Sequence, residues 1–330
     1  MKRQFPLLFW CLAASVSAAE RPEFIFPVNC DYGVDCVIQN YVDNDPTEAW
    51  RDYQCGQQTY DGHTGTDIRI INLPQMAAGI SVLAAAEGMV IATRDGVSDT
   101  YLEPEKRDEI SKIGLGNAVV IKHQNGWRTI YGHLKQNSLM VQKGDMVTRE
   151  QKLGEIGLSG LTEFPHVHFQ VQHFGQIIDP FTGTQQFSLC GDTANNLWNE
   201  NVVEQTTYLS GFLLDYGFND QPPVNYRDIE SGEFNEGIDE DSEHLFFWVR
   251  LIGLSAGDQI TLSITYPDND TVKSRTFSKL ATGKAQIFYY LGIPNPVDPS
   301  GDWQGELILK RASLPQIRKS FSYIVDAEED

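Results

Sequence analysis

The sequence has few basic residues. Lysine and arginine together number 25 of 330 residues, against 45 aspartates and glutamates, so the formal net charge is −20 at pH 7. Binding to duplex nucleic acid requires clustered lysine and arginine, so we expect no nucleic-acid partner. Adhesion to anionic lipid is disfavoured for the same reason.

Long hydrophobic runs are also scarce. The apolar stretch at residues 5–14 is too short to span a bilayer, and polar sequence follows it at once. Lys2 and Arg3 precede this stretch, and small residues at 16–18 (Val-Ser-Ala) provide a cleavage site. Residues 1–19 are therefore typical of a secretory signal peptide. We predict a monomer that is exported to the periplasm or the extracellular space, without stable membrane insertion.

Cysteine is rare. There are five, and Cys11 lies in the predicted signal peptide. The other four are an even number in an exported chain, which favours two disulfides with three possible connectivities. We expect Cys30 to pair with Cys36 across a short loop, and Cys55 with Cys190 across a long one. A zinc site with cysteine ligands is the alternative, but the sequence has no tight CxxC pair.

Short β segments separated by turns make up most of the mature chain. Residues 20–58 are turn-rich and form a disulfide-tied N-terminal segment, and residues 59–190 alternate between predicted strands and glycine turns. A polar linker at 191–210 leads to residues 211–330, whose strands have a spacing typical of an immunoglobulin-like β-sandwich. We therefore predict an all-β protein with an antiparallel sheet domain followed by such a sandwich.

Histidine is infrequent as well, with seven in the chain, and the informative ones lie in three motifs. These are HTGTD from His63, YGHL from Tyr131 and PHVHF from Pro165. Alternate side chains of a strand share a face, so His166 and His168 lie side by side while the residues between and after them face a core. His63 and Asp67 have an even separation, which in an extended segment also places them on one face. Three such ligands, with water in the fourth position, are typical of a catalytic zinc site.

Each motif alone has an ordinary structural interpretation, such as a solvated sheet face or a packed histidine. Together they resemble a known family. The order HTGTD, GNAVVIKHQNGWRTIYGHL and GLSGLTEFPHVHFQV, over about residues 58–183, resembles the LytM/lysostaphin-type zinc metalloendopeptidases. The resemblance implies a compact antiparallel β fold with a groove, one Zn²⁺ ion, and hydrolysis of peptide cross-links in bacterial peptidoglycan.

The resemblance also implies site roles. It assigns zinc ligands to His63, Asp67 and His168, catalysis to His133 and His166, and substrate binding to Asn117 and Tyr131. Residues 161–164 (Leu-Thr-Glu-Phe) depart from the family pattern, which leaves substrate contacts on that loop open. The chain has no HExxH motif, so we expect a zinc-activated water with a histidine, not a glutamate, as the base. Because all of these residues precede position 169, we expect the chemistry not to require residues 211–330.

Three alternatives keep part of this interpretation. A non-catalytic relative that activates a wall amidase typically lacks a zinc ligand, whereas this chain lacks none. A secreted zinc protease on extracellular proteins would use the same chemistry, and a structural zinc module would have four protein ligands. The scissile bond, the role of residues 211–330 and the choice between self and foreign wall stay open.

Overall fold

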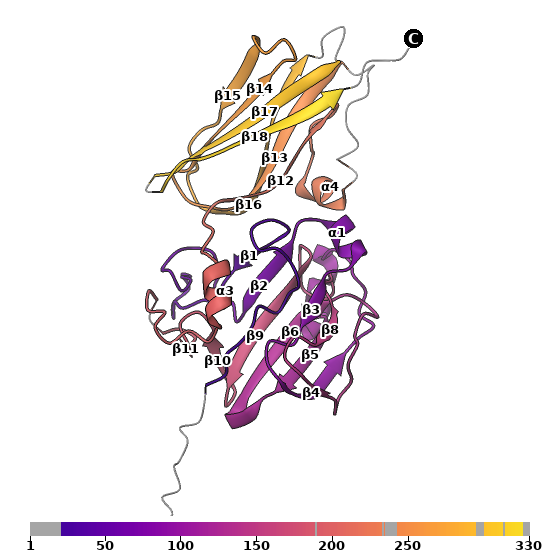
Figure 1. Ribbon diagram of the computed structural model, residues 1–330, viewed down its shortest axis with the longest axis vertical. Helices are drawn as coiled ribbons and strands as arrows, with labels where there is room; N and C mark the ends of the chain where they lie inside the picture. Colours follow the sequence, from indigo (N-terminus) through magenta and orange to yellow (C-terminus); the bar gives the residue numbers. More distant parts are fainter. Residues whose placement is uncertain are drawn as a thin grey trace, which may run out of the picture.

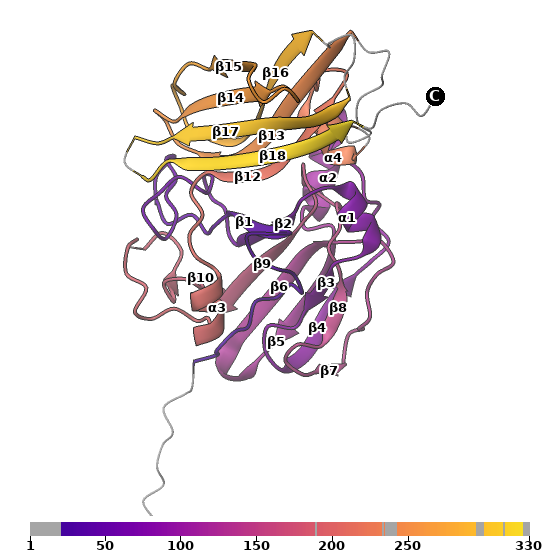
Figure 2. The same ribbon diagram turned by 45° about the horizontal axis from the view of Figure 1, so that its top comes forward.

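The computed structural model describes residues 21–188, 190–232, 234, 243–294, 300–312 and 314–325. The predicted signal peptide lies outside these residues. Figures 1 and 2 show two β-rich parts, with the N-terminal part below the C-terminal part. The predicted all-β, antiparallel architecture is confirmed. Within the described ranges, no helix is both long and apolar enough to cross a bilayer.

The N-terminal part is built on one large antiparallel sheet. Its described strands are β1 Cys36–Asn40, β2 Thr66–Ile70, β3 Ser81–Leu83, β4 Gly88–Arg94, β5 Asn117–Lys122, β6 Trp127–Leu134, β7 Met146–Val147, β8 Lys152–Glu155, β9 His166–His173, β10 Gln176–Asp179 and β11 Thr184–Gln185. The large sheet has the order β1-β2-β9-β6-β5-β4-β7, with β10 paired to β9 and β11 paired to β10, while β3 and β8 pair separately. Short helices α1 Leu73–Ala78, α2 Arg107–Ile110 and α3 Glu200–Gln205 connect the strands.

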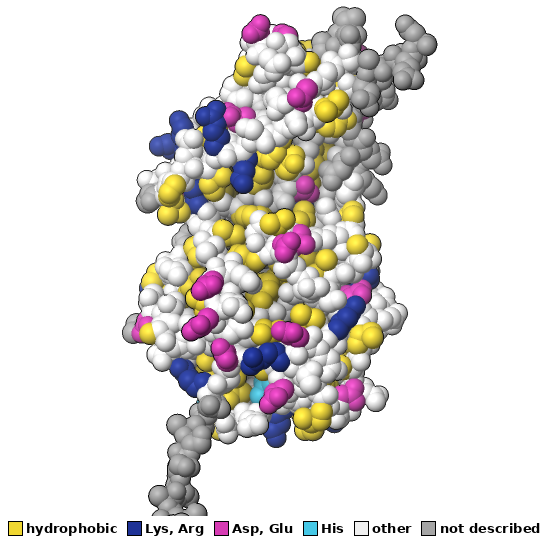
Figure 3. Space-filling view, in the orientation of Figure 1, with side chains coloured by type: hydrophobic (Ala, Val, Ile, Leu, Met, Phe, Trp, Pro, Cys, Tyr) yellow, Lys and Arg dark blue, Asp and Glu magenta, His cyan; other side chains and the backbone are white. Residues whose placement is uncertain are grey.

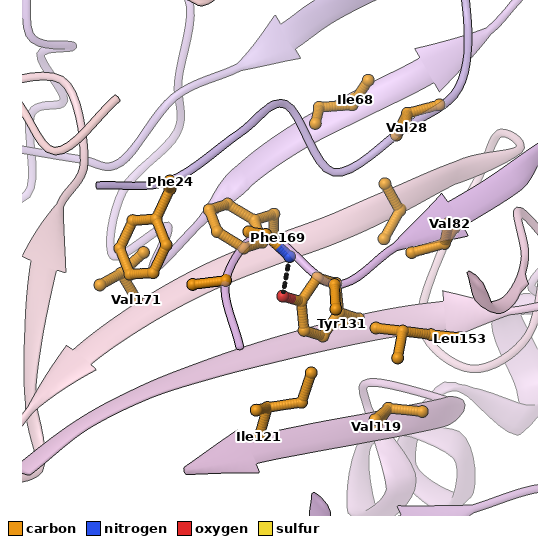
Figure 4. Packing of buried hydrophobic residues seen from close by; sticks show 14 of the residues in the cluster. Phe24, Val28, Ile68, Val82, Val119, Ile121, Tyr131, Leu153, Phe169 and Val171 are labelled. Carbon is orange, nitrogen blue, oxygen red and sulfur yellow. Dashed lines mark hydrogen bonds between the residues drawn. The ribbon is translucent and has the colours of Figure 1, made fainter. Parts of the chain in front are cut away.

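Alternation along the central strands separates the core from the site. Val167, Phe169 and Val171 of β9 belong to the main hydrophobic core and are fully buried, as is Ile68 of β2. Figure 4 shows Ile68, Phe169 and Val171 among the core side chains that come from neighbouring strands. Because successive side chains point to opposite faces, His166 and His168 of β9 are left on the other face of the sheet.

The segments on either side of the peptidase-like sequence pack into this same part. β1 is an edge strand of the large sheet, and disulfides join Cys30 to Cys36 and Cys55 to Cys190. Trp198, from the segment expected to be a linker, is almost fully buried in the main core. Residues 21–58 and much of 191–210 therefore contribute to the N-terminal part.

The C-terminal part consists of two antiparallel sheets around a second core. Its described elements are β12 Phe212–Asn219, α4 Tyr226–Ser231, β13 His244–Leu254, β14 Gln259–Thr265, β15 Val272–Thr276, β16 Lys284–Pro294, β17 Gly301–Lys310 and β18 Ile317–Val325. The sheet orders are β12-β13-β16 and β15-β14-β17-β18, and both sheets contribute to the core, for example through Phe247 and Trp303. Its immunoglobulin-like type stays a prediction.

A buried ion network joins the two parts. Glu230 of α4 accepts hydrogen bonds from Arg69 of β2 at 2.6 Å and from Arg250 of β13 at 3.0 Å, and none of the three side chains is exposed. Tyr101 also donates to Glu230, and Arg69 donates to Gln286 of β16. Figure 3 shows hydrophobic side chains gathered at the same junction on the face that it draws. The two parts are therefore in close contact on the face of β2 that carries Arg69.

Candidate active site

Three potential ligand atoms converge above β2 and β9. Asp67 of β2 lies opposite His168 of β9 in the strand register, and His63 comes from the turn before β2. His63 Nε2 is 3.1 Å from Asp67 Oδ1 and 3.3 Å from His168 Nδ1, and the third distance, His168 Nδ1 to Asp67 Oδ1, is 2.8 Å. The structure therefore brings together all three residues that the resemblance implied as ligands.

The donor set fits a zinc ion. His63 Nδ1 donates to the carbonyl of Tyr41 at 2.7 Å, so the neutral ring turns the lone pair of Nε2 towards the Asp67 carboxylate. The two imidazole nitrogens and the carboxylate oxygen can each offer a lone pair to one shared cation. Tetrahedral zinc with ligands at about 2.0–2.2 Å places ligand atoms roughly 3.3–3.6 Å apart, close to the largest of these separations. Asn40 donates to the other Asp67 oxygen at 2.9 Å and so orients the carboxylate.

The electrostatics of the site favour a negative Asp67. Burial opposes the charged form of Asp67, but the neighbouring His63 and His166 outweigh it and hold the pKa of Asp67 well below its usual range. Burial likewise lowers the pKa of His63, yet the adjacent carboxylate raises that pKa above its ordinary value overall. Asp67 thus offers a charged ligand.

Two further histidines form a pair beside the ligands. His133 Nδ1 donates to the carbonyl of Ser159 at 2.7 Å, and His166 Nδ1 donates to that of Phe164 at 2.9 Å. Their ring centroids are 4.6 Å apart, and His166 Nε2 is 3.5 Å from Asp67 Oδ1. Both rings therefore keep Nε2 available at the site. Burial lowers the pKa of His133 well below its usual value, which keeps this imidazole neutral.

The position of His133 depends on a local break in β6. Tyr131 pairs with Phe169 and Gly132 with His168, so regular alternation would direct His133 towards the core. His133 instead adopts a left-handed backbone conformation with φ of 59°. This conformation is uncommon outside glycine, and it accompanies the placement of the ring beside His166.

The two residues expected to bind substrate, Asn117 and Tyr131, are buried inside the N-terminal part. Tyr131 is fully buried in the core, where its hydroxyl accepts the N–H of Ala85 at 2.9 Å (Figure 4). Asn117 is also fully buried, and its amide nitrogen donates to the carbonyls of Val97 and Leu134. Each side chain supports neighbouring backbone, and its contact with substrate stays a prediction.

The loop that departs from the family pattern supports His166. The ring centroids of Phe164 and His166 are 4.6 Å apart. The Arg69 guanidinium lies over the Phe164 ring, 4.7 Å from its centroid. Thr162 Oγ1 is 3.1 Å from His166 Nδ1. The unusual residues of this loop thus connect the histidine pair to the buried ion network.

Sequence reasoning missed Asn40 and the importance of Gly65. Asn40 lies on β1, far from the motifs in sequence, and no local pattern indicates that β1 pairs with β2. Gly65 is part of HTGTD, and a Cβ there would meet His168 Nε2 at 2.5 Å. The glycine in the motif was therefore a readable signal for close approach.

A second group of potential ligands is not a metal site. Cys30, Asp35 and Cys36 lie close together, but the two cysteines are bonded to each other. Their sulfur atoms are therefore not available as thiolate ligands.

The part of the chain that carries these residues matches a known protein family. Residues 61–180 match the family described as Peptidase family M23. Peptidoglycan DD-endopeptidase ShyA of Vibrio cholerae serotype O1 is 32% identical over 109 residues, which cover 33% of this chain and 20% of that protein. DD-carboxypeptidase/endopeptidase Mpg of Neisseria meningitidis serogroup B is 33% identical over 111 residues, covering 34% of this chain and 23% of that protein.

The relatives and the solved structure each match only part of this chain. The chain spans about a fifth of the length of these curated relatives. Among solved structures, the catalytic domain of the prophage-encoded M23 protein EnpA from Enterococcus faecalis has 23% identity and a TM-score of 0.32, covering 48% of this chain and 94% of that one. The three ligand positions and the histidine pair all lie within the matched range, and residues 61–180 accordingly form a domain of peptidase family M23.

Proposed function

We propose that this protein is an exported zinc metalloendopeptidase that hydrolyses peptide cross-links of bacterial peptidoglycan. The observation that carries the proposal is the convergence of His63 Nε2, Asp67 Oδ1 and His168 Nδ1 within 3.3 Å of one another. Relatives with peptidoglycan endopeptidase names support the substrate class. The signal-like N-terminus and two disulfides support export.

In this proposal His63, Asp67 and His168 hold the zinc, which would activate a water and polarise the scissile carbonyl. The histidine pair divides two tasks. The neutral His133, with Nδ1 held by a backbone carbonyl, accepts the proton of the attacking water at Nε2 and returns it to the leaving amine. His166, in its imidazolium form, has a second N–H at Nε2 with which it would stabilise the carbonyl oxygen as negative charge develops on it.

The test is digestion of purified peptidoglycan by the chain without residues 1–19. We expect zinc-loaded protein to release peptide-containing fragments, and mass spectrometry of those fragments identifies the bond that is cut. Chelated protein and His168→Ala should release none. Casein serves as the protein substrate in parallel.

Two outcomes would redirect the proposal. Zinc-dependent cleavage of casein with intact peptidoglycan would favour the secreted protease. Tight zinc binding with no cleavage of either substrate would favour the non-catalytic, amidase-activating role.

A further inference from the structure

A cavity of about 1010 Å³ lies between the two parts of the molecule, bounded by β1, the 50–60 loop and the ends of β13 and β16. We propose that this cavity binds the carboxylate-bearing peptide of the substrate on the β1 side of the scissile bond. The proposal rests on the peptidoglycan endopeptidase function proposed above, and it adds a binding site formed jointly with the C-terminal part.

Two residues that line the cavity are in direct contact with proposed metal ligands. Asn40 and Tyr60 both line it. Asn40 donates to Asp67 Oδ2 at 2.9 Å, and the Tyr60 ring lies 4.5 Å from the His63 ring. The cavity therefore adjoins two of the three ligands.

The sheet order gives the direction of the substrate. The large sheet runs β1-β2-β9-β6, so the ligands of β2 and β9 lie between the cavity at β1 and His133 on β6. A peptide that crosses these strands, with its scissile bond over β2 and β9, would extend into the cavity on one side. Figures 1 and 2 show β1 and β2 close beneath the C-terminal sheets. Residues of the C-terminal part, among them Gly253 and Lys284, line the cavity on that side.

The charge of the lining selects for an anion. The chain has 45 acidic residues, yet the lining contains no aspartate or glutamate and two basic residues. Arg311 is buried and paired with Asp258 at 3.3 Å, so its charge is already compensated. Lys284, the first residue of β16, is exposed and forms no ion pair within the described part of the chain. Lys284 is therefore the cation available to a ligand carboxylate.

The remaining wall suits a peptide. Trp50 and Tyr60 are 45% and 52% exposed and offer flat apolar surface at low entropic cost. Gln58 donates to the carbonyl of Leu209 at 3.0 Å, while its Oε1 is buried without a partner in the described structure. A small displacement of the wall would let this oxygen accept a peptide N–H.

The 52–58 loop that carries Gln58 is held in place before any ligand arrives. Asp52 accepts the backbone N–H groups of Gly56 and Gln58, and Cys55 is bonded to Cys190. A wall fixed in this way loses little entropy on binding, which favours affinity.

The experiment measures binding by calorimetry on the whole chain, with three soluble probes. The first is a disaccharide-tetrapeptide with free carboxylates, the second is the same compound with amidated carboxylates, and the third is an N-acetylglucosamine tetramer. Lys284→Gln should weaken binding of the free-carboxylate probe about five- to tenfold and leave the amidated probe unchanged. Lys273→Gln, an exposed lysine of β15 outside the cavity, is the matched control and should change neither.

Equal affinity of wild type and Lys284→Gln for the free-carboxylate probe would overturn the proposal. So would binding of the sugar tetramer as tight as that of the peptide probe, which would make the cavity a glycan site. Turnover is measured separately on a soluble cross-linked dimer, where Lys284→Gln should raise KM and leave kcat unchanged. If no protein turned over the dimer while the binding pattern held, the endopeptidase function would fail and the anionic-peptide site would stand.

Discussion

At the scale of single residues, backbone carbonyls decide which histidine nitrogen faces the site. At the site, three ring Nδ1 atoms contact a backbone carbonyl and must donate to it, so the other nitrogen carries the lone pair in the neutral ring. The acceptors are the carbonyls of Tyr41, Ser159 and Phe164 for His63, His133 and His166 respectively. Because the chain path supplies these acceptors, the tautomers follow from the fold and not from other side chains.

Replacement of the two neighbouring histidines of β9 separates ligand from catalyst. His168→Ala leaves two ligands, too few to hold zinc tightly, so we expect both metal and activity to be lost. His166→Ala should keep the metal and lower turnover by about 10²–10⁴, the usual contribution of a positioned acid–base group. Zinc content and turnover are measured on folded protein, and the roles are reversed if His166→Ala is the variant that loses zinc.

Asp179 should make stability depend on pH. It is fully buried, and burial raises its pKa from 3.8 to about 6, while Asn44 and the Phe181 N–H partly compensate. The folded state then binds the proton more tightly than the unfolded state, so stability falls as pH rises from about 4 to 6. Two pKa units correspond to about 3 kcal/mol.

Asp179→Asn should remove this loss. The Asn44 amide can turn so that its oxygen, now buried without a partner in the described structure, accepts from the new amide. Urea unfolding of both proteins between pH 4 and 8 gives the comparison. Parallel stability curves for wild type and variant would show that Asp179 does not titrate in this range.

At the scale of elements, the alternation of β9 was predictable, whereas its partners were not. The sequence places Val167 and Phe169 opposite His166 and His168, and the core contains the first two. The pairing of β9 with β2 and β6, which brings Asp67 opposite His168, joins segments about 100 and 40 residues away in the sequence. The period of the hydrophobic pattern indicates which side chains share a face of a strand, but not which strand pairs with it.

The two disulfides should differ in their effect on stability because their loops differ in length. The Cys55–Cys190 loop spans 135 residues and the Cys30–Cys36 loop spans 6. Loop entropy predicts a contribution of about 5 kcal/mol for the long loop and about 2 kcal/mol for the short one. Unfolding of the two double cysteine-to-alanine variants measures the difference, and equal losses would contradict a loop-entropy origin.

At the scale of the whole molecule, the two parts share a charged interior. Arg69 lies two residues after Asp67 and opposite His166 in the register, and its guanidinium binds Glu230 of the C-terminal part. Removal of residues 211–330 would therefore leave Arg69 without its carboxylate partner. The expected independence of the chemistry from residues 211–330 stays a prediction, and a single substitution tests it with less disturbance than a truncation.

Glu230→Gln should destabilise the junction strongly. Two buried arginines would lose their shared anion, and breaking a buried pair in this way costs about 3–5 kcal/mol. Calorimetric unfolding measures the loss of stability. Zinc content and turnover show whether the substitution also disturbs the site, to which Arg69 connects it. Glu306→Gln, which removes an exposed pair with Arg318, is the control and should change little. Wild-type stability in Glu230→Gln would mean that the network does not hold the two parts together.

The family and the all-β class could be inferred from the sequence because local motifs carry them, and the same motifs named the three candidate ligands that the structure places together. HTGTD and PHVHF each supply side chains with a fixed spacing, and spacing in a strand determines which of them share a face. The even count of mature cysteines likewise anticipated the two disulfides that the structure contains.

Tertiary structure alone decided what surrounds those motifs. The left-handed turn at His133, the burial of Tyr131 and Asn117, and the contact of Asn40 with Asp67 depend on which distant strands pair. The same holds for the junction at Glu230, whose two arginine partners lie 161 and 20 residues away in the sequence. A sequence pattern encodes the face of a strand through its period, but register, partners and buried charge pairs arise only when the chain closes on itself.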